Sequence, residues 1–350
     1  MTNRVFILGA GFSKPADFPL AAELTDELVA KATLDGQVVD FASWLQDLCD
    51  DIRDPVLQDS QPINVEDLIE SALALACLWR SQQYPPHEMN AREHATTCEA
   101  YISYLQHAVA DVIWSKHRTL PTVPDYVRTF AKALGQRDCV ISFNYDIMVE
   151  RALNQFGVGY HHGLDDEHGD SKVPVLKMHG SIDWTLLRQE EELDPSRVGP
   201  TTRLFGEVLS TSQTSNGSMV LWRIEEDAGL GFVIKNRRPN NRIMGLAGLG
   251  GRKAIDEIPG LGRVWSRAHQ MIHLADEIHV VGFSLSPNDL MARLMISNAM
   301  RQRAVGDEPT VHVIDPSVEE LMPRYAQVFR VPVDAHRESA ESVAWDDLAY

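Results

Sequence analysis

The sequence is poor in cysteine and has no long apolar run. Its cysteines, Cys49, Cys77, Cys98 and Cys139, lie far apart and form no CxxC pair, which excludes a zinc ribbon and a dithiol redox site. No apolar run approaches the roughly 20 residues that a membrane helix needs. The N-terminal segment lacks the basic start of a signal peptide, so we expect a cytoplasmic protein.

Positive charge is scarce as well. The 32 lysines and arginines stand against 50 acidic residues, for a net charge of -18. Such a chain repels the phosphate backbone of nucleic acids unless a local basic patch attracts it. The densest basic run, NRRPNNR at residues 236–242, has the composition of a solvated loop. We therefore expect no direct contact with nucleic acid and none with a membrane.

Five apolar segments share one pattern, in which a run of valine, isoleucine and leucine ends in small or polar residues. They are VFILGAG, CVISFN, VPVLKMHG, IHVVGFS and TVHVIDP. Apolar strands that alternate with helices form parallel sheets covered on both faces. We therefore predict an α/β fold with a Rossmann-like parallel sheet and helices on both faces. Ligands of such sheets bind at the carboxyl ends of the strands.

Two segments interrupt this pattern. Residues 40–117 have apolar residues at helical spacing and no strand signal, which predicts a helical insertion. Residues 185–255 are rich in turn residues, which predicts an irregular insertion or a small sheet. We assign residues 1–335 to one catalytic domain and residues 336–350 to an acidic C-terminal tail. The tail forms either a final helix or a partly ordered arm.

The first strand ends in GAGFS. Gly9 and Gly11 permit a sharp turn and a close approach to a phosphate. Ser13 and the start of the next helix offer donors to an anion. The alternative is a tight turn from strand to helix that binds nothing.

Polar side chains also follow the second and third strands. Asn144 and Asp146 either face a crevice or cap the next helix. His179 ends the third strand, where a histidine serves either as a general base or as a hydrogen-bonded core residue. We interpret YHHGLDDEHGD, residues 160–170, as a surface loop whose histidines carry no chemistry.

The fourth and fifth strands end in the same way. Gly282 and Ser284 follow the fourth strand and are placed to contact a phosphate or a ribose. Ser286 and Asp289, three residues apart, predict a capping box. Asp315 follows the fifth strand, where it either accepts hydrogen bonds from a ribose or begins the final helix.

In order, GAGFS, FNYD, KMHGS, VVGFSLSPND and VIDP resemble motifs of the sirtuin family, specifically of its bacterial, sirtuin-like, NAD-consuming branch. PGLGRVW, residues 259–265, resembles a segment that this branch places ahead of the fourth strand. The resemblance implies that the pyrophosphate of NAD lies on Gly9, Ala10, Gly11 and Ser13. It implies that the catalytic group beside the nicotinamide ribose consists of Asn144, Asp146 and His179. It also implies contacts to phosphates or ribose from Gly282, Ser284 and Asp315.

Two features depart from the protein-deacylating sirtuins. Those enzymes follow the glycine loop with a GIPDFR-like segment and carry a four-cysteine zinc module. This chain has KPADFPLAAEL at residues 14–24 and no paired cysteines. The resemblance therefore implies NAD as a substrate, without lysine deacylation and without a metal.

By this resemblance we expect an NAD+ glycohydrolase that acts as a gated effector of bacterial anti-phage defence. Such an enzyme must be restrained, so we expect a homo-oligomer or a partner such as a HerA-like ATPase or an Argonaute-like protein. Two other functions stay open. One is a non-catalytic module that binds NAD or ADP-ribose, and the other is a transferase that moves ADP-ribose or an acyl group.

Overall fold

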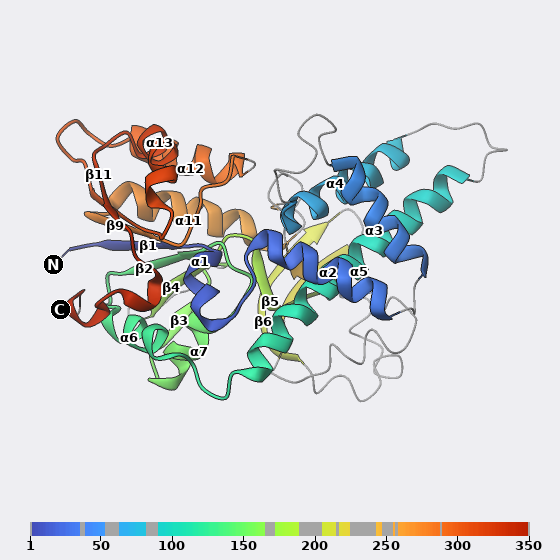
Figure 1. The fold of residues 1–350 in the computed structure, drawn as a ribbon, viewed down its shortest axis with the longest axis horizontal. Helices are drawn as coiled ribbons and strands as arrows, with labels where there is room; N and C mark the ends of the chain where they lie inside the picture. The colour runs from blue at the N-terminus through green and yellow to red at the C-terminus, as the bar shows by residue number, and fades with distance from the viewer. Residues whose placement is uncertain are drawn as a thin grey trace.

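The chain folds around a parallel sheet, beside which lie a group of helices and a smaller antiparallel sheet (Figure 1). No helix among the described residues is long and apolar enough to cross a membrane. The computed structural model describes residues 2–35, 39–52, 63–81, 90–164, 172–188, 205–214, 217–224, 243–246, 255, 258–287 and 289–348.

The parallel sheet has seven strands in the order β11-β10-β9-β1-β2-β4-β3. They are β1 (Arg4–Leu8), β2 (Cys139–Ser142), β3 (Tyr160–His161), β4 (Val173–Lys177), β9 (Glu277–Val281), β10 (Thr310–Ile314) and β11 (Val333–His336). All their paired registers are parallel, and the five predicted segments supply β1, β2, β4, β9 and β10. The predicted α/β fold is therefore confirmed.

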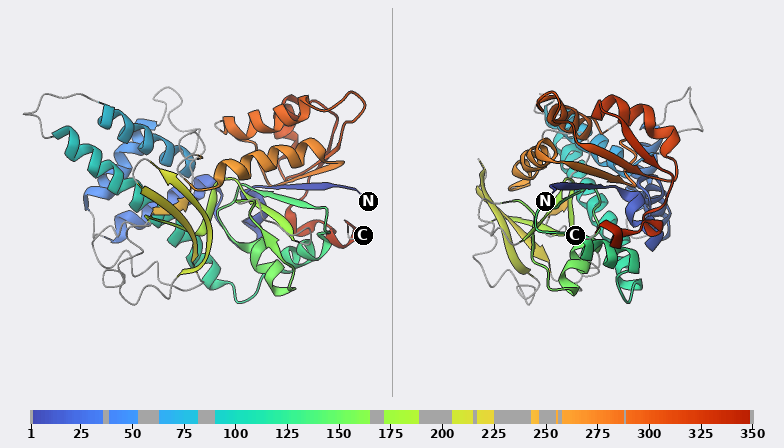
Figure 2. Two further views of the ribbon diagram at one scale, coloured as in Figure 1. Left: turned by 180° about the vertical axis from the view of Figure 1, so that it is seen from behind. Right: turned by 90° about the vertical axis from the view of Figure 1, so that its left-hand side faces the viewer.

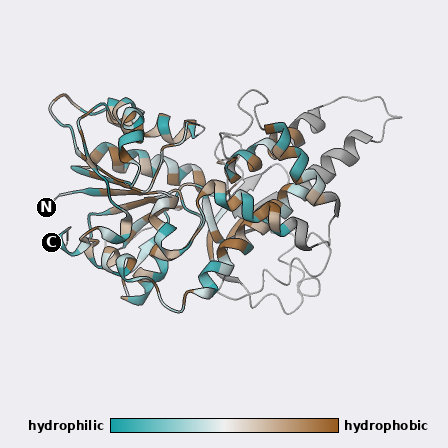
Figure 3. Ribbon diagram, in the orientation of Figure 1, coloured by the Kyte–Doolittle hydropathy of each residue, from teal (hydrophilic) through white to brown (hydrophobic). Residues whose placement is uncertain are grey.

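Helices cover both faces of this sheet. One face packs on α6 (Asp125–Ala133) and α7 (Met148–Gln155), and the other packs on α11 (Leu261–Leu274), α12 (Leu290–Arg301) and α13 (Val318–Phe329). Successive residues of β1 alternate between the two cores, with Phe6 and Leu8 on one side and Val5 and Ile7 on the other. The helices carry both brown and teal segments, as expected of amphipathic elements (Figure 3).

The predicted helical insertion is present, and its helices begin earlier than residue 40. It contains α2 (Ala21–Asp35), α3 (Val39–Ile52), α4 (Val65–Ser81) and α5 (Asn90–Thr119). Their buried side chains, such as Leu28, Leu45 and Leu105, join the same core as Phe6 and Leu8 of β1. The helical group is thus packed onto the main domain through a continuous core.

The second insertion is an antiparallel sheet in the order β6-β7-β5-β8 (Figure 2). Its strands are β5 (Gly180–Arg188), β6 (Phe205–Thr214), β7 (Gly217–Ile224) and β8 (Ile243–Leu246). The two insertions touch, because Gln106 Nε2 of α5 donates to Leu246 O at 2.9 Å. β5 begins directly after His179, so the antiparallel sheet is connected to the carboxyl end of β4. The basic run at residues 236–242 lies outside the described residues.

The segment after β11 is docked onto the core by Trp345. It forms two short 3-10 helices, Ala340–Ser342 and Trp345–Leu348, instead of the predicted helix or partly ordered arm. The Trp345 ring is 1% exposed and lies 5.0 Å from Phe130 and 6.5 Å from Phe6, between ring centroids. The buried indole thus anchors the acidic C-terminal segment to the core of the domain.

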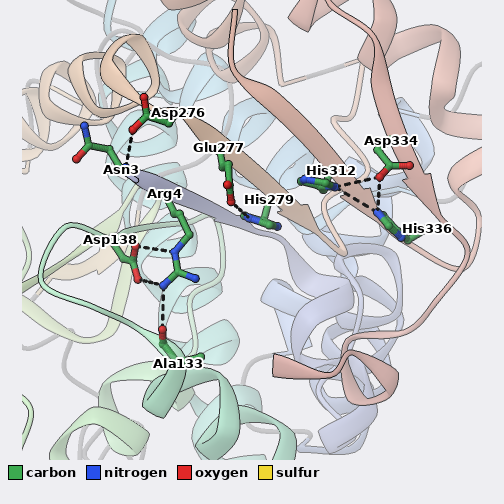
Figure 4. Close-up of polar contacts among 10 residues, drawn as sticks. All are labelled: Asn3, Arg4, Ala133, Asp138, Asp276, Glu277, His279, His312, Asp334 and His336. Atoms are coloured by element: carbon green, nitrogen blue, oxygen red, sulfur yellow. Dashed lines mark hydrogen bonds and ion pairs between the residues drawn. The ribbon is translucent and has the colours of Figure 1, made fainter. Parts of the chain in front are cut away.

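A buried ion pair fixes β1 to the segment that leads into β2 (Figure 4). Arg4 Nε donates to Asp138 Oδ1 at 2.9 Å, and Arg4 Nη2 donates to Asp138 Oδ2 at 2.5 Å and to Ala133 O at 2.9 Å. The two side chains are 4% and 3% exposed. Asp138 also accepts from Gly135 N at 2.6 Å, so both charges have hydrogen-bond partners.

Asp138→Ala is expected to lower the free energy of unfolding by about 3–5 kcal/mol, because it leaves the Arg4 guanidinium buried without its counter-charge. Urea denaturation measures this loss. Arg337→Ala is the matched control, since its ion pair with Glu319 is exposed and spans 3.7 Å. An exposed pair contributes at most about 1 kcal/mol. Equal losses in the two variants would contradict the expectation.

Candidate functional site

The chain changes direction at the centre of the parallel sheet. β2 lies on one side of β1, and the chain later returns to place β9 on the other side. In open α/β sheets, ligands bind beyond the carboxyl ends of the strands at such a switch point. Here the loops after β1 and β9 meet.

Three glycines make this meeting possible. Gly9 N donates to Val281 O at 3.1 Å, and Gly11 N donates to Gly282 O at 2.8 Å. A Cβ added to Gly11 would lie 2.7 Å from Gly282 Cα, and one added to Gly282, whose φ is +58°, would lie 2.3 Å from Gly11 C. Close backbone packing therefore accounts for these glycines. Phosphate contacts from Gly9, Ala10, Gly11 and Gly282 stay a prediction.

Ser13, Asn144 and Asp146 form one hydrogen-bonded cluster. Asn144 Nδ2 donates to Gly9 O at 2.9 Å and to Ser13 Oγ at 3.2 Å. Ser13 Oγ donates to Asp146 Oδ2 at 2.7 Å. The other oxygen, Asp146 Oδ1, accepts from Met148 N at 3.0 Å, at the first residue of α7. Asp146 thus accepts from the first amide of α7, whose N-cap position is Ile147, and also joins the cluster, so the two interpretations of this residue are compatible.

The cluster borders a small pocket. Six of its lining residues come from the glycine loop and the FNYD segment, namely Ala10, Ser13, Phe143, Asn144, Tyr145 and Asp146. The others are Phe18, Pro19, Ala21, Leu24, Val65 and Ile113. Its volume of about 40 Å³ holds a few water molecules. Pockets for nucleotide-sized ligands are about ten times larger. The pocket as the described residues form it would hold only part of a nucleotide.

A buried ion pair between Lys177 and Glu150, which the sequence did not predict, contacts the backbone of Asp146. Lys177 Nζ donates to Asp146 O and lies 3.4 Å from Glu150 Oε1. Burial raises the pKa of the Glu150 carboxyl, and Lys177 partly offsets this rise. The only signal in the sequence was a lysine within the apolar strand VPVLKMHG.

His179 lies next to this pocket but does not line it. The ring is 2% exposed and meets the Phe143 ring edge-on at 5.2 Å, and Phe143 does line the pocket. Trp265 lies on another side, 6.4 Å from the imidazole, and its Nε1 donates to Met178 O at 3.0 Å. Neither nitrogen of His179 has a hydrogen-bond partner among the residues that the structure describes. Two residues that line the pocket, Phe143 and Tyr145, thus lie beside the imidazole, the second at 6.1 Å between ring centroids, and no hydrogen bond among the described residues joins the ring to Ser13, Asn144 or Asp146.

Asp289 is the acidic group that faces His179, and sequence reasoning did not find this contact. Asp289 Oδ2 lies 3.8 Å from His179 Nε2. Asp289 Oδ1 accepts from Ala292 N at 3.0 Å, so Asp289 itself is the N-cap of α12. The predicted capping box, with Ser286 as the N-cap, is therefore wrong, because the helix begins three residues later.

Burial changes the pKa values of both members of this pair. It lowers the pKa of His179 to about 4, a change that the nearby Phe143 backbone partly offsets. It raises the pKa of Asp289 to about 7, against the effect of the Ala292 amide. The pair is thus held as a neutral imidazole beside a carboxyl that gains its proton near neutral pH.

Two more predicted residues lie at the same edge of the sheet. Ser284 is exposed, and its carbonyl oxygen accepts from Arg324 Nη1 at 3.3 Å. Asp315 is half-buried, and its Oδ1 accepts from Ser317 N at 2.8 Å, just ahead of α13. The interpretation of Asp315 as the start of a helix is supported by this bond. Ribose contacts from these residues stay a prediction.

Residues 160–170 were interpreted as a surface loop, but their described part is not a loop on the surface. His161 belongs to β3, and His162 is buried with its Nδ1 2.9 Å from Val175 O. The interpretation is wrong here because Tyr160 and His161 pair with β4, and His162 is buried beside that strand. Residues 165–170 lie outside the described residues.

No protein-family model and no curated protein matches this chain. Among solved structures, one described as "Structural Basis for the Mechanism and Regulation of Sir2 Enzymes" aligns at 13% identity over 99% of this chain and 90% of the other, with a TM-score of 0.41. A second, of Sir2 with the inhibitor EX-527, 2'-O-acetyl-ADP-ribose and a deacetylated p53 peptide, aligns at 11% identity over 97% and 89%, with a TM-score of 0.40. The strand order itself defines the fold as a Rossmann-like parallel sheet.

The pairing of His179 with Asp289 predicts opposite pH dependences in two variants. In Asp289→Asn, stability should fall as the pH drops from 6.5 to 4, because unfolded His179 binds a proton that the folded form rejects. In His179→Asn, stability should rise as the pH drops from 7 to 3.8, because folded Asp289 binds a proton that the unfolded chain does not. Urea denaturation against pH, expressed relative to the His179→Asn/Asp289→Asn double variant, which lacks both groups, measures both slopes. Parallel slopes would show that the two groups do not shift as described.

Proposed function

We propose that this protein is an NAD+ glycohydrolase, which releases nicotinamide and ADP-ribose. The observation that carries the proposal is the Ser13–Asn144–Asp146 cluster at the switch point, formed by residues more than 130 positions apart. A hydroxyl, an amide and a carboxylate beside a pocket suit the diol of a ribose. The order of the motifs, which resembles the NAD-consuming branch of the sirtuins, supports the same substrate.

The chemistry needs positioning more than it needs acid catalysis. Nicotinamide leaves NAD as a neutral pyridine, because the electron pair of the C1′–N bond neutralises the pyridinium nitrogen. The bond from C1′ to water then forms, and water loses a proton. Asn144 and Asp146 would orient the ribose and this water, and the Asp146 carboxylate would stabilise the positive charge that develops at C1′.

His179 would accept the proton. Its two unpartnered nitrogens and its neutral form above pH 4 support this role. While the ring is buried, its low pKa makes it a weak base. Access of water or of a ribose hydroxyl to the ring would bring the pKa back toward 6.5, where imidazole is an effective base at neutral pH.

The small pocket supports a gated enzyme. A volume of about 40 Å³ beside Asn144 excludes NAD, and Phe143 stands next to His179. An unrestrained NAD hydrolase would deplete its own cell. We propose that formation of a homo-oligomer, or contact with a partner such as a HerA-like ATPase or an Argonaute-like protein, widens the pocket during anti-phage defence.

A second function is favoured by one observation. His179 does not line the pocket, so the same residues would also serve a non-catalytic module that binds NAD or ADP-ribose and regulates a partner. Such a module would bind the nucleotide without release of nicotinamide. A transferase would instead pass the ADP-ribosyl or acyl group to an added acceptor.

His179→Ala is expected to lower nicotinamide release from a fluorescent NAD analogue by at least about 100-fold, the usual contribution of a general base. NAD binding, measured by calorimetry, should change little. His269→Ala, which removes a surface imidazole bonded to Asn298, is the control. Full turnover in His179→Ala would remove the histidine from the mechanism. Binding without turnover in the wild type, in every oligomeric state, would favour the regulatory module.

The gate predicts that turnover follows the state of assembly. Separation of the wild-type protein by size, with an assay of each fraction, should give a higher rate per chain in the oligomer or in a complex with a partner. The physical reason is that only a widened pocket admits NAD. An isolated monomer with the full rate would contradict gating, while leaving the hydrolase activity intact.

A further inference from the structure

Two strands at the edge of the parallel sheet bring three metal-binding side chains together (Figure 4). His312 lies on β10, and Asp334 and His336 lie on β11. The register pairs His312 with Asp334 and Ile314 with His336. Because alternate residues of a strand share a face, all three side chains stand on the same side of the sheet.

Their donor atoms form an equal-sided triangle. His312 Nδ1 lies 3.3 Å from His336 Nε2 and 3.3 Å from Asp334 Oδ2, and the last two atoms are also 3.3 Å apart. A tetrahedral Zn²⁺ ion with bonds of about 2.0–2.1 Å separates its ligand atoms by about 3.3–3.4 Å. The three atoms therefore already have the spacing of one face of a zinc tetrahedron.

We propose that His312, Asp334 and His336 bind a divalent transition-metal ion, with Zn²⁺ as the best match. Two imidazole nitrogens and one carboxylate oxygen are donors that zinc and its neighbours accept, whereas Ca²⁺ and Mg²⁺ require oxygen ligands. The side chains are 24%, 60% and 36% exposed, so an ion reaches them from solvent and keeps a fourth position open to water or to a further ligand.

The sheet holds one of these ligands in place. The His312 ring stacks on His279 at 4.9 Å with an interplanar angle of 12°, and His279 stacks on Phe6 at 5.0 Å and 16°. Phe6, His279 and His312 are paired in register across β1, β9 and β10. The buried rings of Phe6 and His279 thus fix the plane of the exposed imidazole, as supporting contacts do at metal sites.

The position of the site indicates its effect on the fold. β11 is the edge strand and pairs only with β10 in the described sheet. The residues that follow β11 include Trp345, which closes the core over Phe6. A metal ion that joins β10 to β11 would stabilise this edge through binding linkage. The proposed site is independent of the proposed hydrolase activity. The sequence predicted no metal, because these three residues do not follow a recognisable spacing of metal ligands.

The experiment uses the whole chain without an affinity tag, stripped of metal with a chelator. Titration with Zn²⁺ by calorimetry should show one site per chain. Titration with Co²⁺ should give the visible absorption bands of tetrahedral cobalt, which report direct ligation. His312→Ala and His336→Ala should each weaken Zn²⁺ binding by more than about tenfold and abolish the cobalt bands. Asp334→Asn, which keeps the shape of the side chain, should weaken binding as well.

The controls separate ligation from folding. His269→Ala should bind Zn²⁺ and Co²⁺ as the wild type does, because it removes a surface imidazole elsewhere. Without metal, the variants should melt near the wild-type temperature, and Zn²⁺ should raise that temperature only in the wild type and in His269→Ala. Absence of the cobalt bands in the wild type, or bands that persist in the His312→Ala/His336→Ala double variant, would overturn the site. Neither result bears on NAD hydrolysis.

Discussion

The structure depends on the contact of two backbones at the centre of the sheet. The loops that follow β1 and β9 pack so closely at Gly9, Gly11 and Gly282 that no side chain fits between them. This contact joins the first strand to the second half of the chain. It also orients the loop that carries Ser13 toward Asn144 and Asp146, so the cluster beside the pocket follows from it.

Around His179 the determining factor is the free-energy cost of burying a charge. Phe143, Trp265 and Asp289 lie around the imidazole, whose nitrogens have no hydrogen-bond partner in the described part of the chain. Burial favours the neutral form of both groups, which lowers the cost of this arrangement.

The sequence predicted the parallel sheet well because its buried strands are continuous apolar runs, and VFILGAG or IHVVGFS cannot be mistaken for surface segments. β3 and β11 were missed because they are short and polar, and pairing with a neighbour makes them strands. Ser13, Asn144 and Asp146 were each singled out as polar residues at strand ends, but the hydrogen bonds that join them were not predicted. Asp289 beside His179 was not predicted either, because a contact between remote segments leaves no periodic signal.

Trp345 has a consequence for how the chain is made. The strand that begins the fold, β1, is also its centre, and the indole that covers Phe6 comes from the far end of the described chain. Ribosomes add about 5–20 residues each second, so the side of β1 that carries Phe6 contacts Trp345 only many seconds after β1 has been made. During translation the Phe6 side of β1 therefore stays partly uncovered until the segment around Trp345 has been made, and an apolar surface of this kind is prone to aggregation.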